Sequence, residues 1–224
     1  MIKFAPEGYP FIFGSLLVTA VFSVLWFLAR KSGSNSAILY FLLAGFCLFA
    51  VMTCFMAFFF RDPDRKIPAG EGLFVSPADG KIILIKDIPE KDHLKAETKE
   101  ISIFMSPLNV HVNRAPCDGR VTLVKYSPGK YMAAYREDSS FKNENIVMVL
   151  EGNQGNVLVR QVAGFLARRA VCRAEVGDIL MRGERYGIIK FSSRLDIYLP
   201  QDVRIAVNMG DTVKAGETVL ASLK

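Results

Sequence analysis

The sequence is poor in the residues that most often build metal centres. It contains two histidines, one tryptophan and four cysteines among 224 residues. Cys47 and Cys54 lie in an apolar stretch, and Cys117 and Cys172 stand alone further along the chain. No cysteine pair has the spacing of metal ligands, and a cytoplasmic domain would keep its thiols reduced. The sequence therefore predicts no metal site and no disulfide.

Clusters of basic residues are also missing. The net charge is +6, but there is no run of Lys and Arg and no aromatic stacking motif. This excludes nucleic acid as the expected partner. A mildly basic protein that is held at a bilayer is instead attracted to anionic lipid head groups.

Two long stretches, Phe11–Ala29 and Ala37–Phe60, have no charged residue at all. Each is about as long as the roughly 20 apolar residues that a membrane-spanning helix needs. The first is too long for the core of a cleaved signal peptide, and Leu28-Ala29-Arg30 offers no small-residue cleavage pattern. We therefore expect a membrane anchor over residues 1–60, with transmembrane helices at 11–29 and 37–60.

The connection between these helices, residues 30–36, is short and rich in turn residues, which predicts an antiparallel hairpin with both ends on one side. Basic residues near the chain ends outnumber those in the loop; they are Lys3, Arg61, Arg65 and Lys66 against Arg30 and Lys31. By the positive-inside rule, the rest of the chain is expected at the cytoplasmic face of the cell membrane.

After a charged, proline-broken linker (61–70), residues 71–224 are predicted to form a mostly β domain, a β-sandwich or barrel-like fold. Six β-branched or aromatic runs bounded by turn residues predict strands at 81–85, 101–104, 120–124, 146–150, 157–162 and 195–199. Residues 164–174 fit a short helix or a strand.

Two segments of this domain, 176–184 and 209–217, echo each other. Each has Gly-Asp, an apolar residue and then Gly-Glu, and glycine supplies the backbone freedom of tight turns. The pattern is similar to turns in lipoyl and biotinyl carrier domains. The carrier lysine at a hairpin tip is absent. The repeated pattern therefore predicts lipoyl-like hairpins as a structural feature and not a carrier function.

Few residues remain as candidates for chemistry. His93 lies in a charged stretch typical of a solvated loop, whereas His111 lies in a proline-containing segment after a strand, where a catalytic and a structural histidine are equally expected. Asp79 belongs to an ordinary Asp-Gly turn, or orients His111 if the two meet in space. Ser192 and Ser193 are two hydroxyls in a predicted strand.

The order of several segments along the chain indicates how these residues belong together. The helical hairpin ends in Arg61-Asp62-Pro63-Asp64-Arg65, and the other segments are 76–80, 104–116, 163–169, 183–187 and 191–200. In this order the chain closely resembles the short, archaeal-type and bacterial, form of phosphatidylserine decarboxylase over nearly its whole length.

The resemblance implies a pyruvoyl enzyme that makes its own cofactor. The proenzyme would cleave itself between Ser192 and Ser193, giving a β chain (1–192) and an α chain (193–224) whose Ser193 becomes a covalent pyruvoyl group. The ketone condenses with the serine amine of phosphatidylserine and provides the electron sink that decarboxylation to phosphatidylethanolamine requires. The expected partner is thus a phospholipid in the membrane.

The resemblance also assigns site residues. His111 matches the first histidine of the family segment and is the candidate for proton transfer, and Asp79 matches the aspartate of the family triad. Longer members carry a second histidine where this chain has Arg114. Arg194 is the candidate phosphate contact, because guanidinium forks match phosphate oxygens. Arg168 and Arg169 are weaker candidates, since ordinary surface charge explains them as well.

Ser192 is the main departure, because most relatives have glycine before the modified serine. Some other pyruvoyl enzymes cut between two serines, so we expect cleavage, with an unprocessed or inactive relative as the alternative. Two other functions stay open: a non-enzymatic membrane adaptor with a lipoyl-like domain, and a decarboxylase of a related, ether-linked serine phospholipid. The sequence leaves the oligomeric state open, including a homo-oligomer.

Overall fold

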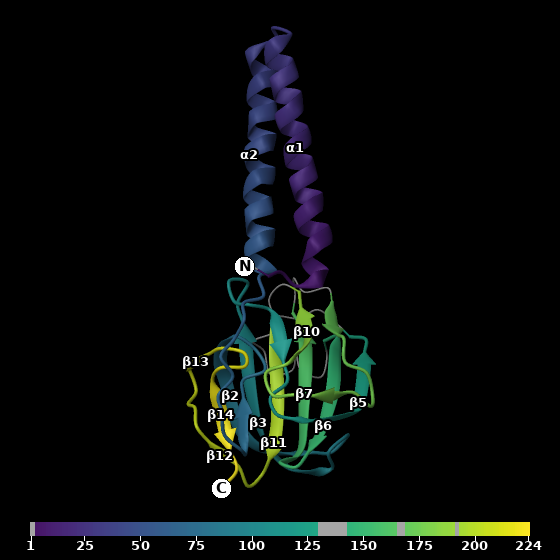
Figure 1. Cartoon of the computed structure of the whole chain (residues 1–224), viewed down its shortest axis with the longest axis vertical. Helices are drawn as coiled ribbons and strands as arrows, with labels where there is room; N and C mark the ends of the chain where they lie inside the picture. Colours follow the sequence, from purple (N-terminus) through teal and green to yellow (C-terminus); the bar gives the residue numbers. More distant parts are fainter. Residues whose placement is uncertain (1–2, 130–142, 165–168, 191–192) are drawn as a thin grey trace. The chain divides into compact units, whose positions relative to one another are not determined.

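The computed structural model describes residues 3–129, 143–164, 169–190 and 193–224. The chain divides into two compact units, Met1–Pro63 and Asp64–Lys224. The first is helical and the second is built from strands (Figure 1). The predicted fold class, a mostly β domain behind two apolar helices, is confirmed.

The first unit is an antiparallel helical hairpin. It consists of η1 (Pro6–Gly8), α1 (Tyr9–Lys31) and α2 (Ser36–Phe59). The Asn35 side chain caps α2 by accepting a hydrogen bond from the Ile38 N–H at 3.1 Å. The Phe22 ring stacks on Phe49 and lies against Gly45, where a Cβ would meet that ring. Both helices are long and apolar enough to cross a membrane.

All six predicted strands are present in the second unit, and residues 170–172 form a strand rather than a helix. The strands are β1 (Leu73–Val75), β2 (Gly80–Glu90), β3 (Ala96–Met105), β4 (Val112–Arg114), β5 (Gly119–Ser127), β6 (Asn145–Gly152), β7 (Gly155–Ala163), β8 (Ala170–Cys172), β9 (Ile179–Leu180), β10 (Arg185–Ile189), β11 (Ser193–Pro200), β12 (Arg204–Ile205), β13 (Thr212–Val213) and β14 (Val219–Ser222).

The main sheet is antiparallel and curled, with the strand order β13-β2-β3-β11-β7-β6-β5-β9 (Figure 1). Two smaller sheets have the orders β1-β14-β12 and β4-β10-β8. Along β11, Leu195, Ile197 and Leu199 point into the main hydrophobic core. Alternate residues such as Arg194 and Asp196 point to the opposite face, as the period of two in a strand requires. β11 thus lies in the middle of the sheet, with its odd-numbered side chains in the core.

The two echoing segments form the two edges of the main sheet. Each contributes a two-residue strand, β13 beside β2 and β9 beside β5. Their aspartates act alike, because Asp211 accepts from the Asn208 N–H and Asp178 from the Glu175 N–H, each at 2.8 Å. Both segments therefore turn the chain in the same way at opposite edges.

The strands beside these edges repeat as well. The chain reads Pro-Ala-Asp-Gly-Lys-Ile from Pro77 and Pro-Cys-Asp-Gly-Arg-Val from Pro116. Asp79 Oδ1 accepts from the Ala215 N–H and Asp118 Oδ1 from the Arg182 N–H, each at 2.7 Å. The second unit thus contains an internal repeat in which Asp79 and Asp118 hold equivalent turns.

The segment that begins the second unit is fixed to it rather than free. Asp64 pairs with Arg185 at 2.9 Å, and the Arg182 guanidinium donates to the carbonyls of Pro68 and Gly70 at 2.9 and 2.8 Å. Residues 64–70 of the expected linker are therefore part of the folded domain.

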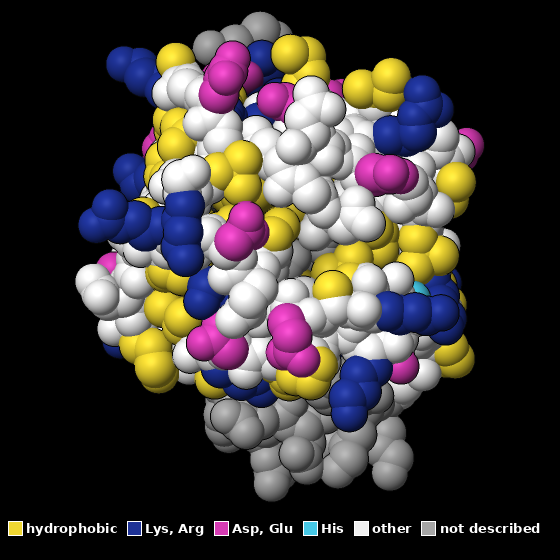
Figure 2. Space-filling model, turned by 90° about the horizontal axis from the view of Figure 1, so that it is seen from below, with side chains coloured by type: hydrophobic (Ala, Val, Ile, Leu, Met, Phe, Trp, Pro, Cys, Tyr) yellow, Lys and Arg dark blue, Asp and Glu magenta, His cyan; other side chains and the backbone are white. Residues whose placement is uncertain are grey.

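On the face shown in Figure 2, basic and acidic side chains alternate, with hydrophobic side chains in small groups among them.

Candidate active site

Ser193 begins β11 in the interior of the second unit. Its neighbours across the sheet are Met105 on β3 and Ala163 on β7, and all three residues are fully buried. The Ser193 hydroxyl donates to Met105 Sδ at 3.3 Å. Because a thioether is a weak acceptor, this contact orients the hydroxyl without strongly occupying it. Such a hydroxyl is available as a nucleophile once a base takes its proton.

His111 is also fully buried, and a tight turn holds its ring. His111 Nδ1 lies 3.0 Å from the carbonyl oxygen of Asn109. The Asn109 side chain closes that turn by accepting from the Ser106 N–H at 2.9 Å. Since a carbonyl oxygen only accepts, Nδ1 carries the hydrogen in the neutral ring and the lone pair is on Nε2. His111 is thus built to receive a proton at Nε2.

The strand pairing brings His111 close to the segment that leads to Ser193. The Ile189 N–H, at the end of β10, donates to the His111 carbonyl at 3.3 Å. Ser193 follows four residues later, and four residues span at most about 14 Å when extended. Ser192 itself lies outside the described residues. The fold therefore places a buried proton acceptor in the neighbourhood of the predicted cleavage site.

Two buried amides next to this site had not been singled out from the sequence. Gln161 Nε2 donates to Asn113 Oδ1 at 2.8 Å and to the Val171 carbonyl at 3.2 Å. Asn113 Nδ2 lies 4.0 Å from Met105 Sδ. They link β7 of the main sheet to β4 and β8 of the small sheet. One signal was available, namely a glutamine inside the apolar run 157–162.

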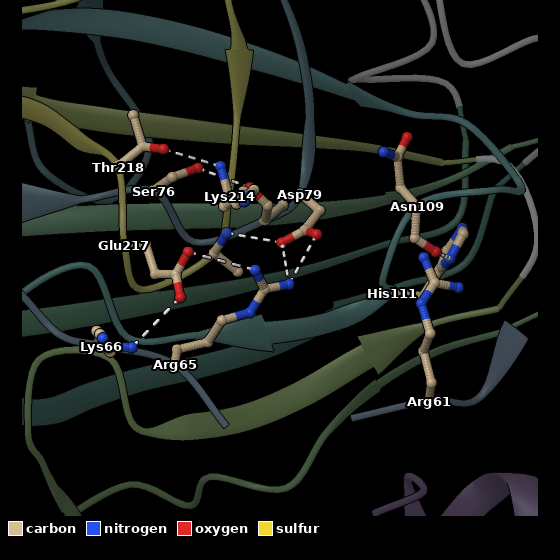
Figure 3. Close-up of polar contacts among 12 residues, drawn as sticks. Arg61, Arg65, Lys66, Ser76, Asp79, Asn109, His111, Lys214, Glu217 and Thr218 are labelled. Atoms are coloured by element: carbon tan, nitrogen blue, oxygen red, sulfur yellow. Dashed lines mark hydrogen bonds and ion pairs between the residues drawn. The ribbon is translucent and has the colours of Figure 1, made fainter. Parts of the chain in front are cut away.

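Asp79 is engaged elsewhere. Its carboxylate accepts from Arg65 Nη2 at 2.8 and 3.0 Å, and Arg65 also faces Glu217 at 3.6 Å. Figure 3 shows Asp79 pointing toward Arg65, while His111 lies apart from this cluster beside Asn109. Among the described residues, Asp79 has no hydrogen bond to His111. The orienting role expected for Asp79 stays a prediction, and the contacts present are those of a turn-holding residue.

Arg194 points to the face of the main sheet opposite Ser193. Its guanidinium donates to Asp196 at 2.5 Å and to Ser102 at 2.7 Å, and it faces Glu100 at 3.5 Å. It is almost fully buried there. Its expected contact with a lipid phosphate therefore stays a prediction. Arg168 lies outside the described residues, and Arg169 is exposed.

The two thiols of the second unit are poor candidates for nucleophiles. Burial raises the pKa of the Cys117 thiol to about 12, and burial also raises the pKa of Cys172. Only a thiolate attacks efficiently, so both stay protonated at neutral pH. Within the described ranges no group of three His, Cys, Asp or Glu side chains is placed to hold a metal ion.

Comparisons with known proteins identify the family of the chain. The family model for phosphatidylserine decarboxylase matches residues 52–221. The chain belongs to the phosphatidylserine decarboxylase family. It is 44% identical to the phosphatidylserine decarboxylase proenzyme of Geobacter metallireducens over 98% of this chain and 96% of that protein. It is 47% identical to the proenzyme of Geobacter sp. strain M21, with the same coverage, and 41% identical to that of Desulfotalea psychrophila, over 99% of this chain and 97% of that protein.

The match to the phosphatidylserine decarboxylase family extends over all the predicted site residues. The matched range includes Asp79, His111 and Ser193, and the alignments to the relatives extend over the helical hairpin as well. The surroundings of Ser193 also fit a covalent pyruvoyl group, because Met105 and Ala163 form a buried, weakly polar environment in which a ketone is shielded from water.

Proposed function

We propose that the chain is a proenzyme that cleaves itself before Ser193 and then decarboxylates phosphatidylserine to phosphatidylethanolamine. The observation that carries this proposal is the buried Ser193 hydroxyl at the start of β11, with His111 on the adjoining segment, in a chain of this family. Neither residue would be needed in a membrane adaptor.

Self-cleavage begins when the Ser193 Oγ attacks the carbonyl carbon of residue 192. The peptide C–N bond breaks, the nitrogen of residue 193 gains a proton, and an ester replaces the amide. Loss of the α-proton of residue 193 then expels residue 192 as a carboxylate and leaves a carbon–carbon double bond at residue 193. The β-carbon takes up a proton, which gives an imine, and water replaces the imine nitrogen, which leaves as ammonia. The products are a β chain (1–192) and an α chain (193–224) that begins with a pyruvoyl group.

His111 is the proposed proton carrier in these steps. The hydroxyl proton, and later the α-proton, must be taken up by a nearby group. A histidine with its lone pair on Nε2 can accept such a proton, and the Asn109 carbonyl keeps the ring in this tautomer. The pyruvoyl group supplies the electron sink for decarboxylation, while the fold keeps its surroundings buried.

The helical hairpin matches a lipid substrate. A diacyl lipid leaves the bilayer only at a cost of about 0.8 kcal/mol for each buried methylene. Two spanning helices would keep the domain where the head group is, and the excess of basic residues near the chain ends supports a cytoplasmic domain. A cysteine placed at Ser34, between the helices, should react with an impermeant maleimide from outside intact cells. Labelling only after lysis would show that the loop lies inside the cell and that the proposed orientation is wrong.

Mass spectrometry of the purified protein tests the proposed function. We expect two chains, with residues 193–224 carrying a carbonyl that reacts with hydroxylamine, and release of CO₂ from phosphatidylserine vesicles. Ser193→Ala should remain one chain and inactive. An intact, inactive wild type would favour the adaptor. Cleavage of Ser193→Ala at the same bond would rule out Ser193 as the nucleophile, whereas cleavage between residues 191 and 192 would assign that role to Ser192. Comparing diacyl with ether-linked phosphatidylserine identifies the preferred lipid.

A further inference from the structure

The described side chains directly across the sheet from Ser193 offer no strong hydrogen-bonding group. Directly across the sheet are the thioether of Met105 and the methyl group of Ala163. Among the described residues, the only hydrogen bond of the Ser193 hydroxyl is the one to Met105 Sδ at 3.3 Å. This is unusual, because buried hydroxyls ordinarily find an oxygen or nitrogen partner.

Amides are present nearby, but they bond to each other. Asn113 Nδ2 lies 4.0 Å from the Met105 sulfur, and its Oδ1 accepts from Gln161 at 2.8 Å. Gln161 is in turn fixed by the Val171 carbonyl. The sulfur of Met105 therefore contacts both the amide pair and Ser193.

The proposed self-cleavage changes what residue 193 presents to Met105. In the precursor the side chain is a hydroxymethyl group. During cleavage its oxygen leaves with the carboxylate of residue 192, and the ketone oxygen comes from water. The former β-carbon ends as the methyl group of the pyruvoyl. One buried position must thus hold a polar group first and an apolar group afterwards.

We propose that Met105 is the side chain that accommodates both forms of residue 193, an inference that rests on the proposed self-cleavage. A thioether accepts weakly from the hydroxyl and packs well against a methyl group. A strong partner would stabilise the precursor and would then be left buried and unpaired beside the methyl of the product, which is costly. Met105 therefore favours the forward conversion.

The test compares two substitutions of Met105 in the full-length chain. Met105→Gln places a strong hydrogen-bonding amide beside Ser193, and Met105→Leu keeps the volume and the apolar surface. Met148→Gln is the matched control, because Met148 is a buried methionine of the same core that lies on β6. Cleavage of freshly synthesised chains is followed on denaturing gels, and the products are weighed by mass spectrometry.

We expect the cleavage rate of Met105→Gln to fall by on the order of tenfold. The cleavage rates of Met105→Leu and of the folded part of Met148→Gln should stay within about threefold of the wild-type rate. Equal rates for Met105→Gln and wild type, or no cleavage in Met105→Leu, would overturn the role of Met105. A wild type that does not cleave would overturn the proposed function itself.

A second measurement covers the case in which Met105→Gln folds poorly. Ser193→Ala puts a methyl beside the sulfur in an uncleavable chain. In this background we expect Met105→Gln to lower the melting temperature in detergent by about 5 °C and Met105→Leu to change it by less than about 2 °C. Equal melting temperatures for the two variants would contradict the inference.

Discussion

Two histidines with different surroundings allow a direct comparison at the level of single residues. His111 is fully buried beside Ile189, whereas His93 lies partly exposed in the turn between β2 and β3. We expect His111→Gln to slow self-cleavage by roughly 10²- to 10⁴-fold, the usual contribution of a general acid or base. His93→Gln, the matched control, should cleave at the wild-type rate. Gel analysis of both variants checks this, and normal cleavage of His111→Gln would remove His111 from the mechanism.

The pair formed by Arg65 and Asp79 separates a structural role from a catalytic one. Both side chains are about nine-tenths buried. Removal of Asp79 leaves the Arg65 guanidinium with the longer, 3.6 Å contact to the partly exposed Glu217. Breaking a buried pair in this way costs roughly 3–5 kcal/mol, whereas replacing both partners is often far less harmful. We therefore expect Asp79→Asn to fold poorly and to cleave little, and Arg65→Met/Asp79→Asn to recover both stability and cleavage.

The double variant decides between the two roles because it separates folding from chemistry. Recovery of the melting temperature without recovery of cleavage would indicate that Asp79 takes part in the cleavage reaction. Asp118→Asn supplies the reference, since Asp118 holds the equivalent turn through the Arg182 N–H. It should lower stability without any direct effect on the chemistry.

Among the structural elements, the small sheet β4-β10-β8 adjoins the proposed site, because β4 directly follows His111, and Gly187 lets this sheet form. A Cβ at Gly187 would lie 2.3 Å from the Val171 carbonyl oxygen and 2.9 Å from Gln161 Nε2. Gly187→Ala must therefore push β10 away from β8 and from the main sheet. We expect a loss of about 1–3 kcal/mol in stability and slower cleavage, measured by thermal melting and gels.

A useful control for that substitution is Gly177→Ala, which lies in an edge turn. Gly177 has a φ of 104° but nothing within 4 Å of a Cβ. It should lose stability through backbone strain alone and keep its rate of cleavage once folded. If both variants cleave equally, the small sheet does not set the position of His111.

The helices and strands differ in how well the sequence predicts them. The six predicted strands are long enough for β-branched runs to reveal them, and the apolar helices follow from the absence of charge. β9 and β13 have two residues each, too few for any periodicity. Their positions follow from long-range pairing with β5 and β2, which no local pattern encodes.

Long-range pairing also explains which site residues were missed. Ser193 and His111 belong to segments with a known order in the family, so the resemblance predicted them as site residues. Met105 faces Ser193 only because β3 pairs with β11, 88 positions later in the chain. Its chemistry is ordinary until that neighbour is known. The contact of Asp79 with Arg65 was likewise invisible, because nothing in either motif specifies it.

At the scale of the whole molecule, the chain combines a helical unit with a β unit that has its own core, and the two units should be separable in function. The residues proposed for self-cleavage all belong to the second unit. Reaching phosphatidylserine in a bilayer needs an attachment that raises the local concentration of the domain at the surface. A chain of residues 64–224 should therefore still cleave before Ser193.

This shortened chain should decarboxylate phosphatidylserine in vesicles at least roughly tenfold more slowly than the full chain, because it lacks the tether. With a short-chain phosphatidylserine below its micelle concentration, the two forms should have similar rates, since no bilayer has to be reached. Measuring CO₂ release with both substrates separates the two effects. A shortened chain that cleaves normally but fails on the soluble lipid as well would mean that the helices contribute to the site itself and not only to its location.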